Sequence, residues 1–208
     1  MIDKSSSFLI ILSAPSGGGK STILSEILKF ADDIDYSISY TTRKPRGIEE
    51  NGVHYNFVDE DEFERRMSRN DFLETAQVFG NWYGTSISFI KKRLAMGRHV
   101  IMDIDVQGAS QISNEDIPYI KIFIIPPTMK VLRERLINRG TDTMEEIEKR
   151  LNIAQSEINK IPCYDYLVIN DDLKQAVEDV WACIRAEENK VNRYINPIEG
   201  FLNSGELT

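Results

Sequence analysis

The segment formed by residues 8–28 constrains the fold more than any other part of this sequence. It consists of an apolar pentapeptide, FLIIL, then a turn with three consecutive glycines, then apolar residues at helical spacing. A short, fully apolar run is typical of a strand that is buried on both faces, as in a parallel sheet. We therefore predict a strand, a glycine-rich turn and a helix whose apolar face packs against the sheet.

The same alternation continues along the chain. Apolar runs at residues 99–104, 119–125 and 166–169 predict three more strands, each followed by a turn or the start of a helix. The last helix is expected to take Asp171 or Asp172 as its N-cap. Its apolar face would consist of Leu173, Ala176, Val177, Val180, Trp181 and Ile184. The predicted fold class is α/β, with a parallel-sheet core covered by helices.

Two segments interrupt this order. Residues 37–88 mix alternating and charged stretches and predict a small α+β insertion. Residues 129–159 are charged and helical in pattern, with Gly140 as an interruption; mobile lids have this composition, and so do ordinary solvated helices. The core would then comprise residues 1–36, 89–128 and 160–195. Residues 196–208 offer little to bury and are expected to fray.

The charge balance excludes some partners. With 33 acidic and 25 basic side chains, the net charge is −8, so the molecule as a whole is not attracted to nucleic acid or to an anionic membrane. No apolar run approaches the roughly 18–20 residues that cross a bilayer, and the first residues do not have the pattern of a secretion signal. We predict a cytoplasmic protein, either a monomer or a homodimer.

The two cysteines, Cys163 and Cys183, have neither metal-ligand spacing nor a disulfide-rich context. Free cysteines are among the residues most often found in protein interiors. We predict that both are buried thiols.

The glycine-rich turn predicts a site for a polyphosphate. Three glycines let backbone N–H groups point inward, and the following helix adds the positive end of its dipole. Lys20 would supply charge to the β and γ phosphates of a nucleoside triphosphate, and the Ser21 hydroxyl would ligate Mg²⁺. The predicted ATP-binding residues are Ala14, Pro15, Ser16, Gly17, Gly18, Gly19, Lys20, Ser21 and Thr22. The alternative is a turn that merely joins strand to helix.

One position of this turn departs from the consensus G-x-x-x-x-G-K-S, because Ala14 stands where the first glycine is expected. The departure is minor if the alanine keeps a backbone conformation that its Cβ tolerates. The three following glycines carry the tight curvature.

A second anion site is suggested by Arg43 and Arg46, which lie three residues apart around Pro45. Paired guanidinium groups suit a phosphate, and the hydroxyls of Tyr55 and Tyr83 would add hydrogen-bond donors. Taken alone, two arginines near a turn are as often solvated surface.

Several stretches together resemble the guanylate kinase family, over roughly residues 8–193. The matching stretches are residues 14–22, SYTTRKPR at 39–46, NGVHYNF at 51–57, FLE at 72–74, WYGT at 82–85, DIDVQG at 103–108, RL at 135–136, RGT at 139–141, KRL at 149–151 and NDD at 170–172. The resemblance implies transfer of the γ-phosphoryl group of ATP to GMP, with Mg²⁺ as cofactor. It also implies that residues 37–88 bind GMP and that residues 129–159 form the lid.

The resemblance also assigns individual residues. It implies that Ser39, Arg43, Arg46, Tyr55 and Tyr83 surround the GMP phosphate, that Glu74 and Thr85 read the base, and that Asn170 contacts adenine. Physical chemistry supports the role of Glu74, because guanine presents N1–H and its N2 amino group side by side, a donor pair that one carboxylate accepts with both oxygens. Thr85 would donate to O6. Without the resemblance, Glu74 would be a solvent-facing carboxylate.

The transfer itself requires alignment and charge neutralisation more than proton removal, because the acceptor oxygen is already ionised near neutral pH. His54 and His99 are therefore expected to be structural. Arg135 and Arg139 lie four apart on a predicted helix, hence on one face, with Arg150 in the next helical stretch; by resemblance these are lid residues. The alternative for each is a surface ion pair.

Asp103 and Asp105 follow a predicted core strand, at the edge where ligands of open α/β sheets bind. A carboxylate there would hold Mg²⁺ through water or position the acceptor, and Asp103 is the predicted participant. The alternative is capping of the following turn.

Two other functions remain possible for the chain as a whole. One is a P-loop kinase for a phosphorylated sugar, which needs no guanine-reading residues. The other is a non-catalytic module that binds a phosphopeptide, which needs no Lys20 or Ser21.

Overall fold

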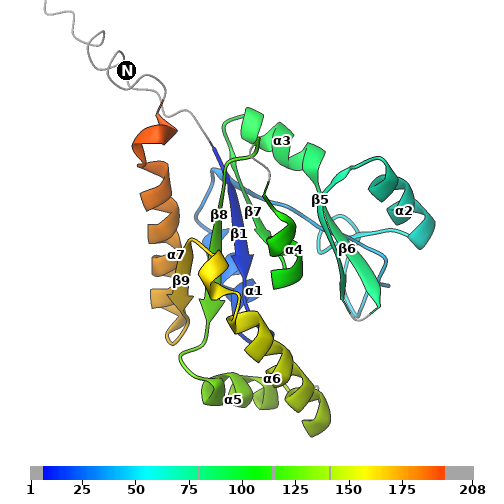
Figure 1. Cartoon of the computed structure of the whole chain (residues 1–208), viewed down its shortest axis with the longest axis vertical. Helices are drawn as coiled ribbons and strands as arrows, with labels where there is room; N and C mark the ends of the chain where they lie inside the picture. The colour runs from blue at the N-terminus through cyan, green and yellow to red at the C-terminus, as the bar shows by residue number, and fades with distance from the viewer. Residues whose placement is uncertain (1–6, 79, 114–115, 141, 195–208) are drawn as a thin grey trace, which may run out of the picture.

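A parallel sheet forms the centre of the computed structural model, which describes residues 7–78, 80–113, 116–140 and 142–194. Its strand order is β2-β7-β1-β8-β9, and Figure 1 shows β7, β1, β8 and β9 side by side. The strands are β1 (Leu9–Ser13), β2 (Ile34–Tyr36), β7 (His99–Asp103), β8 (Tyr119–Ile125) and β9 (Tyr166–Ile169). The four strands predicted from apolar runs are confirmed, and β2 is a fifth that the sequence analysis missed.

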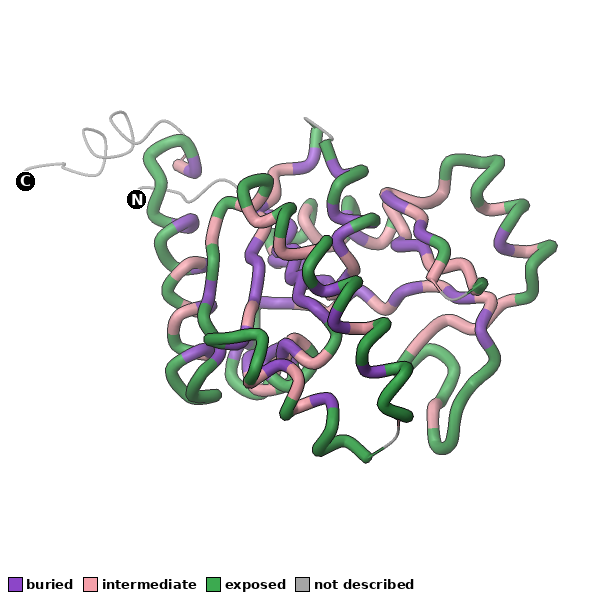
Figure 2. The backbone as a smooth tube through the Cα atoms, turned by 60° about the horizontal axis from the view of Figure 1, so that its bottom comes forward, coloured by how far each residue is buried: buried purple, intermediate pink, exposed green. Residues whose placement is uncertain are grey.

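Every residue of β1 is buried, because the strand lies between β7 and β8 and is covered on both faces. Ile10 and Leu12 face the cluster formed with α1 (Lys20–Ile27) and α7 (Leu173–Glu188). Leu9 and Ile11 face the opposite cluster, which includes residues of α3 (Ile87–Ala95) and α4 (Val106–Gln111). Figure 2 shows this buried centre with exposed residues on the outer helices. The predicted α/β class is confirmed.

The predictions for α7 are correct for its N-cap and for three of its buried residues, and wrong for Leu173. Asp172 is the N-cap and accepts a hydrogen bond from the backbone N–H of Gln175. Ala176, Val180 and Ile184 are buried in the core as predicted. Leu173, by contrast, is 38% exposed at the first position of α7.

A second sheet lies beside the first (Figure 1). Its order is β4-β3-β6-β5, with strands β3 (Tyr40–Thr41), β4 (Asn56–Phe57), β5 (Phe72–Val78) and β6 (Asn81–Ser86). Helix α2 (Glu60–Ser68) covers it through the buried Phe63, whose ring stacks on Phe72 and Trp82. Strands and a helix therefore do alternate within residues 37–88, as an α+β insertion requires.

Helices α5 (Met129–Asn138) and α6 (Met144–Ile158) form a pair with an apolar cluster of its own, made of Leu132, Leu136, Ile147, Leu151 and Ala154. Gly140 has a positive φ of 65° in the connection between them. Thr143 and Glu146 form a reciprocal capping box at the start of α6. The predicted helical segment with a break at Gly140 is confirmed, and Figure 1 places it beyond the carboxyl ends of the central strands.

The prediction of two buried cysteines is wrong for Cys163, which is exposed, whereas Cys183 is partly buried. Cys163 ends a 3-10 turn, Ile161–Cys163, in which none of the three residues is buried. The predicted fraying of residues 196–208 lies outside the described residues. In the part of the chain that the structure describes, every helix is too short or too polar to cross a membrane.

Candidate active site

The turn between β1 and α1 has the curvature that its glycines predict. Gly17 and Gly19 have φ angles of 92° and 97°, a region that side chains rarely adopt. A Cβ on Gly19 would clash with the side-chain nitrogen of Asn170. Among the described residues Asn70 is the one non-glycine with a positive φ, so the alanine at position 14 needs no unusual backbone conformation.

A cavity of about 450 Å³ adjoins this turn. It is lined by Ala14, Pro15, Ser16, Gly17, Gly19, Lys20, Ser21, Thr22, Gln77, Val78, Asp105, Arg139, Arg150, Ile153 and Glu157. Lys20 points across the carboxyl end of β7: its Nζ donates to the carbonyl oxygen of Ile104 at 3.1 Å and lies 3.7 Å from Asp103 Oδ2. The lysine predicted for phosphate therefore lies beside the carboxylate predicted for the acceptor side.

Three side chains from distant parts of the chain contact the turn or its support. Asn170 is buried and donates from Nδ2 to the carbonyl oxygen of Gly18 at 2.8 Å. Arg135 donates to the carbonyl oxygen of Asn170 at 2.8 Å, and Arg150 donates to Ser16 Oγ at 2.8 Å. Asn170, which is predicted to contact adenine, thus holds the glycine turn through its side-chain amide. It also lines a pocket of about 300 Å³ together with Arg135, Arg139 and Asp171.

Arg43, in the second sheet's region, is buried and makes a bidentate contact with Glu49. Its Nη1 and Nη2 donate to the two carboxylate oxygens at 2.9 and 2.8 Å. The hydrogen bond from Arg43 lowers the pKa of Glu49 to about 2, so the pair is ionised at neutral pH. The guanidinium also lies over the rings of Tyr55 and Phe57, at 5.3 and 5.8 Å from their centroids.

The other residues predicted for the acceptor phosphate surround this pair. The rings of Tyr55 and Tyr83 are 5.9 Å apart, and burial raises the pKa of Tyr55, which keeps its hydroxyl a donor. Ser39 is buried, whereas Arg46 is exposed. Tyr36, at the end of β2, donates to Asp103 Oδ1 at 2.7 Å. Tyr55 therefore lies close to both Arg43 and Asp103, and Tyr83 lies close to Arg43.

Glu74 and Thr85 face each other across strands β5 and β6. Both are buried, and Thr85 Oγ1 donates to Glu74 Oε1 at 2.6 Å. Burial raises the pKa of Glu74 to about 7, and the charge of Asp105 adds to the rise. Thr85 is predicted to donate its hydroxyl proton to O6 of guanine, but in this structure it donates that proton to Glu74. A Cβ on Gly108 would lie 2.5 Å from Glu74 Oε2, so glycine leaves the room that this carboxylate occupies.

Asp105 performs the alternative role considered for it: it is the N-cap of α4 and accepts from the backbone N–H of Gly108 at 2.8 Å. It also lines the cavity at the glycine turn. The chain of contacts Glu74, Gly108, Asp105 therefore links the base-reading pair to the predicted phosphate cradle.

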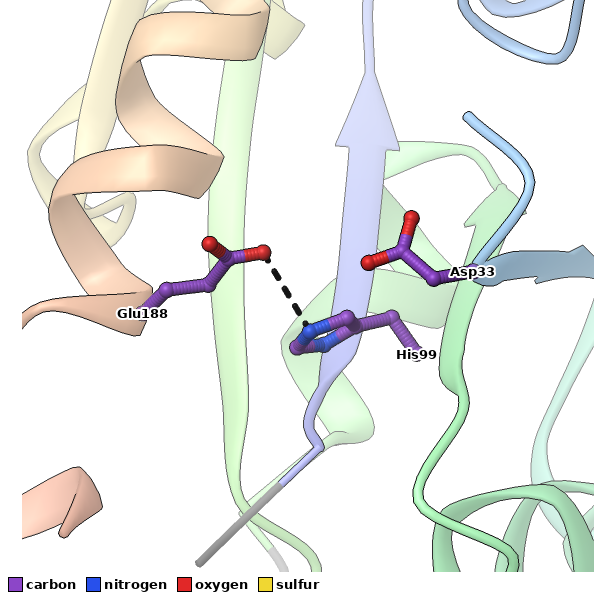
Figure 3. A group of neighbouring side chains, drawn as sticks. All are labelled: Asp33, His99 and Glu188. Carbon is purple, nitrogen blue, oxygen red and sulfur yellow. Dashed lines mark ion pairs between the residues drawn. The ribbon is translucent and has the colours of Figure 1, made fainter. Parts of the chain in front are cut away.

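The histidines make structural contacts. Among the described residues, Asp33, His99 and Glu188 form the one histidine–carboxylate group with ligand atoms within 4.8 Å of one another (Figure 3). His99 Nδ1 accepts from the backbone N–H of Phe8 at 3.2 Å, so the neutral ring carries its proton on Nε2, which lies 3.4 Å from Glu188. A protonated nitrogen is not a metal ligand. This group lies at the amino ends of β1 and β7, the edge of the sheet opposite the glycine turn.

Comparisons with known proteins agree with this geometry. The guanylate kinase family model matches residues 6–187. The guanylate kinase of Clostridioides difficile (strain 630) is 43% identical over 190 residues, which cover 91% of this chain and 93% of that protein. The guanylate kinase of Carboxydothermus hydrogenoformans is 45% identical over 185 residues, covering 89% and 91%. A solved guanylate kinase structure from Anaplasma phagocytophilum superposes with a TM-score of 0.78 at 33% identity, covering 94% and 93% of the two chains.

The chain belongs to the guanylate kinase family. Guanylate kinases are nucleoside monophosphate kinases, that is, ATP:GMP phosphotransferases, so the predicted enzyme class is confirmed. The site residues predicted from the sequence form two groups in the structure. Lys20, Arg135, Arg139, Arg150 and Asn170 lie around the glycine turn; Ser39, Arg43, Arg46, Tyr55, Glu74, Tyr83 and Thr85 belong to the second sheet and its loops. Asp103 lies between them.

Three further side chains contact the predicted site residues or line the cavity, and none of them was predicted from the sequence. Glu49 pairs with Arg43, Tyr36 binds Asp103, and Glu157 lines the cavity with a pKa that burial raises to about 7. Glu49 carries a signal that can be read from sequence, since an acid near two arginines in one loop is a natural partner. Tyr36 and Glu157 carry none, because tertiary packing alone brings them to the site.

Proposed function

We propose that the guanylate kinase reaction of this chain takes place between two anion sites that meet at Asp103. ATP binds with its phosphates in the glycine turn, and GMP binds within residues 37–88. The observation that carries this assignment is the position of Glu74: a buried carboxylate, held by Thr85, lies next to Asp105, which lines the phosphate cavity. A phosphate cradle with a guanine-reading carboxylate beside it fits GMP as the acceptor.

In the acceptor site, the phosphate of GMP would be bound by Arg43, Arg46, Ser39, Tyr55 and Tyr83. Glu74 would accept from N1–H and the N2 amino group of guanine with its two oxygens. Thr85 then has two roles open to it: it orients Glu74 in the free enzyme, and it can turn its hydroxyl to O6 in the complex. A site built on such hydrogen bonds rejects analogues that lack the donors by as much as about 10⁴-fold.

In the donor site, residues 14–22 would wrap the phosphates of ATP, with Lys20 at the β and γ positions. The 300 Å³ pocket beside Asn170 and Asp171 is the space available for adenine. Oxygen donors suit Mg²⁺: Ser21 would ligate it, and Asp103 would hold it through water. Ser21 is exposed at the start of α1, and Asp103 lies near Lys20, so the donor set fits. When bound, the metal neutralises charge on the phosphates.

Phosphoryl transfer needs the acceptor oxygen in line with the γ-phosphorus and little proton chemistry, since a phosphate monoester is already ionised near neutral pH. Arg135, Arg139 and Arg150 would spread positive charge over the transferring oxygens once α5 and α6, within residues 129–159, close as a lid. Arginines in this role accelerate transfer by about 10³ to 10⁵ where they have been measured. Closure also excludes water, which limits hydrolysis of ATP.

This assignment divides the chain as the sequence predicts, into a core, the GMP-binding residues 37–88 and the lid. We place the reaction in the cytoplasm, where ATP and GMP are found, with a monomer or a homodimer as the working unit.

A coupled assay with Mg-ATP and a panel of acceptors tests the proposed function. GMP should be phosphorylated far faster than AMP, CMP, UMP or phosphorylated sugars. A preference for a phosphosugar would assign a different kinase activity. Binding of GMP without turnover, in an enzyme preparation with intact fold, would indicate a binding module instead.

A further inference from the structure

We propose that Glu49 is a positioning residue for the acceptor phosphate: it fixes the guanidinium of Arg43 so that the edge not bound by Glu49 faces the substrate. This inference rests on the proposed function, because it assigns Arg43 to the phosphate of GMP.

The hydrogen bonds that Arg43 donates to Lys44 and Glu49 leave a defined edge of the guanidinium free of both residues. Arg43 Nη1 donates to the carbonyl oxygen of Lys44 at 2.8 Å and to Glu49 Oε2 at 2.9 Å, which uses both of its protons. Nη2 uses one proton on Glu49 Oε1 at 2.8 Å. Of the five N–H donors of an arginine, the Nε proton and the second Nη2 proton remain. These two lie side by side on the adjacent edge, where they match two oxygens of one phosphate.

The same carboxylate also fixes the second arginine. Glu49 Oε2 accepts from the backbone N–H of Arg46 at 2.7 Å. One side chain therefore ties the guanidinium of Arg43 to the main chain of Arg46, and so sets the spacing of the two cations. The guanidinium of Arg46 is left exposed and available to the substrate.

The environment of Arg43 holds the guanidinium in place from other sides as well. It lies over the rings of Tyr55 and Phe57, and a hydrogen bond that it donates to the hydroxyl oxygen of Tyr83 contributes to its raised pKa. Since Tyr55 and Tyr83 are themselves assigned to the phosphate, the edge that Glu49 leaves free belongs to the same site. Glu49 completes an arrangement in which little rotamer freedom remains to be lost when GMP binds.

A competing role makes the opposite prediction. If Glu49 instead occupied the position of the substrate phosphate, it would have to leave Arg43 before GMP binds, and its removal would tighten GMP binding. The positioning role predicts weaker binding, because Arg43 would then lose its fixed orientation.

The experiment compares GMP with guanosine, which lacks the phosphate, by calorimetry and competition in the absence of ATP. In Glu49→Ala, the dissociation constant of GMP should rise about tenfold, while that of guanosine and the KM for ATP stay within about twofold. Glu49→Gln, which keeps the side-chain length and one acceptor oxygen, should show a smaller rise. Glu50→Ala removes the same charge from the same loop at an exposed position and should bind GMP as the parent does.

A double variant tests whether Glu49 acts through Arg43. In an Arg43→Ala background, the further change Glu49→Ala should weaken GMP binding less than it does in the parent, because only the contact of Glu49 with the main chain of Arg46 is then left to lose. Tighter or unchanged GMP binding in Glu49→Ala, an equal loss for guanosine, or an undiminished loss in the Arg43→Ala background would each overturn the positioning role. If Arg43→Ala itself bound GMP normally, the assignment of Arg43 in the proposed function would fail, whatever Glu49 does.

Discussion

Glu74, when ionised, makes the free enzyme less stable because its carboxylate is buried, and the substitution Glu74→Gln measures this cost. Burial raises the pKa of Glu74 from 4.5 to about 7. At about 1.4 kcal/mol for each pH unit, this difference corresponds to about 3 kcal/mol of unfavourable free energy for the ionised carboxylate in the folded state. A neutral glutamine keeps an acceptor oxygen for Thr85 and does not carry this cost.

The sign follows from linkage. Because the pKa is higher in the folded than in the unfolded state, the contribution of Glu74 to stability is fully present below pH 4.5 and is lost as the pH rises through 7. Glu74→Gln should therefore raise the free energy of unfolding at pH 8, by up to about 3 kcal/mol, and have little effect at pH 5. The figure is an upper limit, since the new amide nitrogen needs a hydrogen-bond acceptor.

The assay is urea unfolding without nucleotide at pH 5 and pH 8, with Glu50→Gln as an exposed control that should show no such pH dependence. The same variant should raise the KM for GMP by at least about tenfold and leave the KM for ATP nearly unchanged. The reason is that the side-chain NH₂ of glutamine would meet one of the two N–H donors of guanine, where the carboxylate has an acceptor oxygen. Equal stabilisation at both pH values, or destabilisation at pH 8, would refute the argument from burial. Equal losses for GMP and ATP would refute the base-reading role.

Three further predictions concern the phosphate cradle and the lid. Lys20→Ala should abolish turnover while GMP affinity, measured by calorimetry, stays largely intact; normal turnover would contradict the role of Lys20. Gly19→Ala should lower ATP affinity and stability more than Gly97→Ala. Both glycines have positive φ angles, but a Cβ at position 19 would meet Asn170, whereas a Cβ at position 97 would meet nothing within 4 Å. Equal effects of the two substitutions in thermal denaturation and ATP titration would show that the contact with Asn170 is unimportant. GMP and an unreactive ATP analogue together should reduce the radius of gyration in small-angle scattering, and an unchanged radius would count against closure of α5 and α6.

The parts of the fold that were predictable from sequence are those whose signal is local. Strand β1, the glycine turn and α1 are adjacent in the chain, and each has a pattern that few other structures share. Strand β2 was missed because Ile34–Tyr36 is too short for a pattern and becomes a strand only by pairing with β7. Leu173 continues the apolar spacing of α7, but spacing does not tell where the sheet beneath the helix ends.

The site shows the same limit. The types of residue that suit a phosphate can be identified from the sequence, but most of their partners in the free enzyme cannot. That Thr85 donates to Glu74 and that Asn170 supports Gly18 are consequences of tertiary packing, whereas the pairing of Glu49 with Arg43 lies within one loop and could have been predicted. Burial of Cys163 was predicted from the general behaviour of cysteines, and it failed because the residue ends an exposed 3-10 turn.

The central claim is that donor and acceptor phosphates meet between the glycine turn and Arg43. A crystal structure with GMP, an unreactive ATP analogue and Mg²⁺ tests this claim most directly. The account predicts the GMP phosphate within hydrogen-bond distance of Arg43 and Arg46, guanine on Glu74, and the phosphates of the analogue on Lys20. Electron density for GMP at any other place on the enzyme would contradict it.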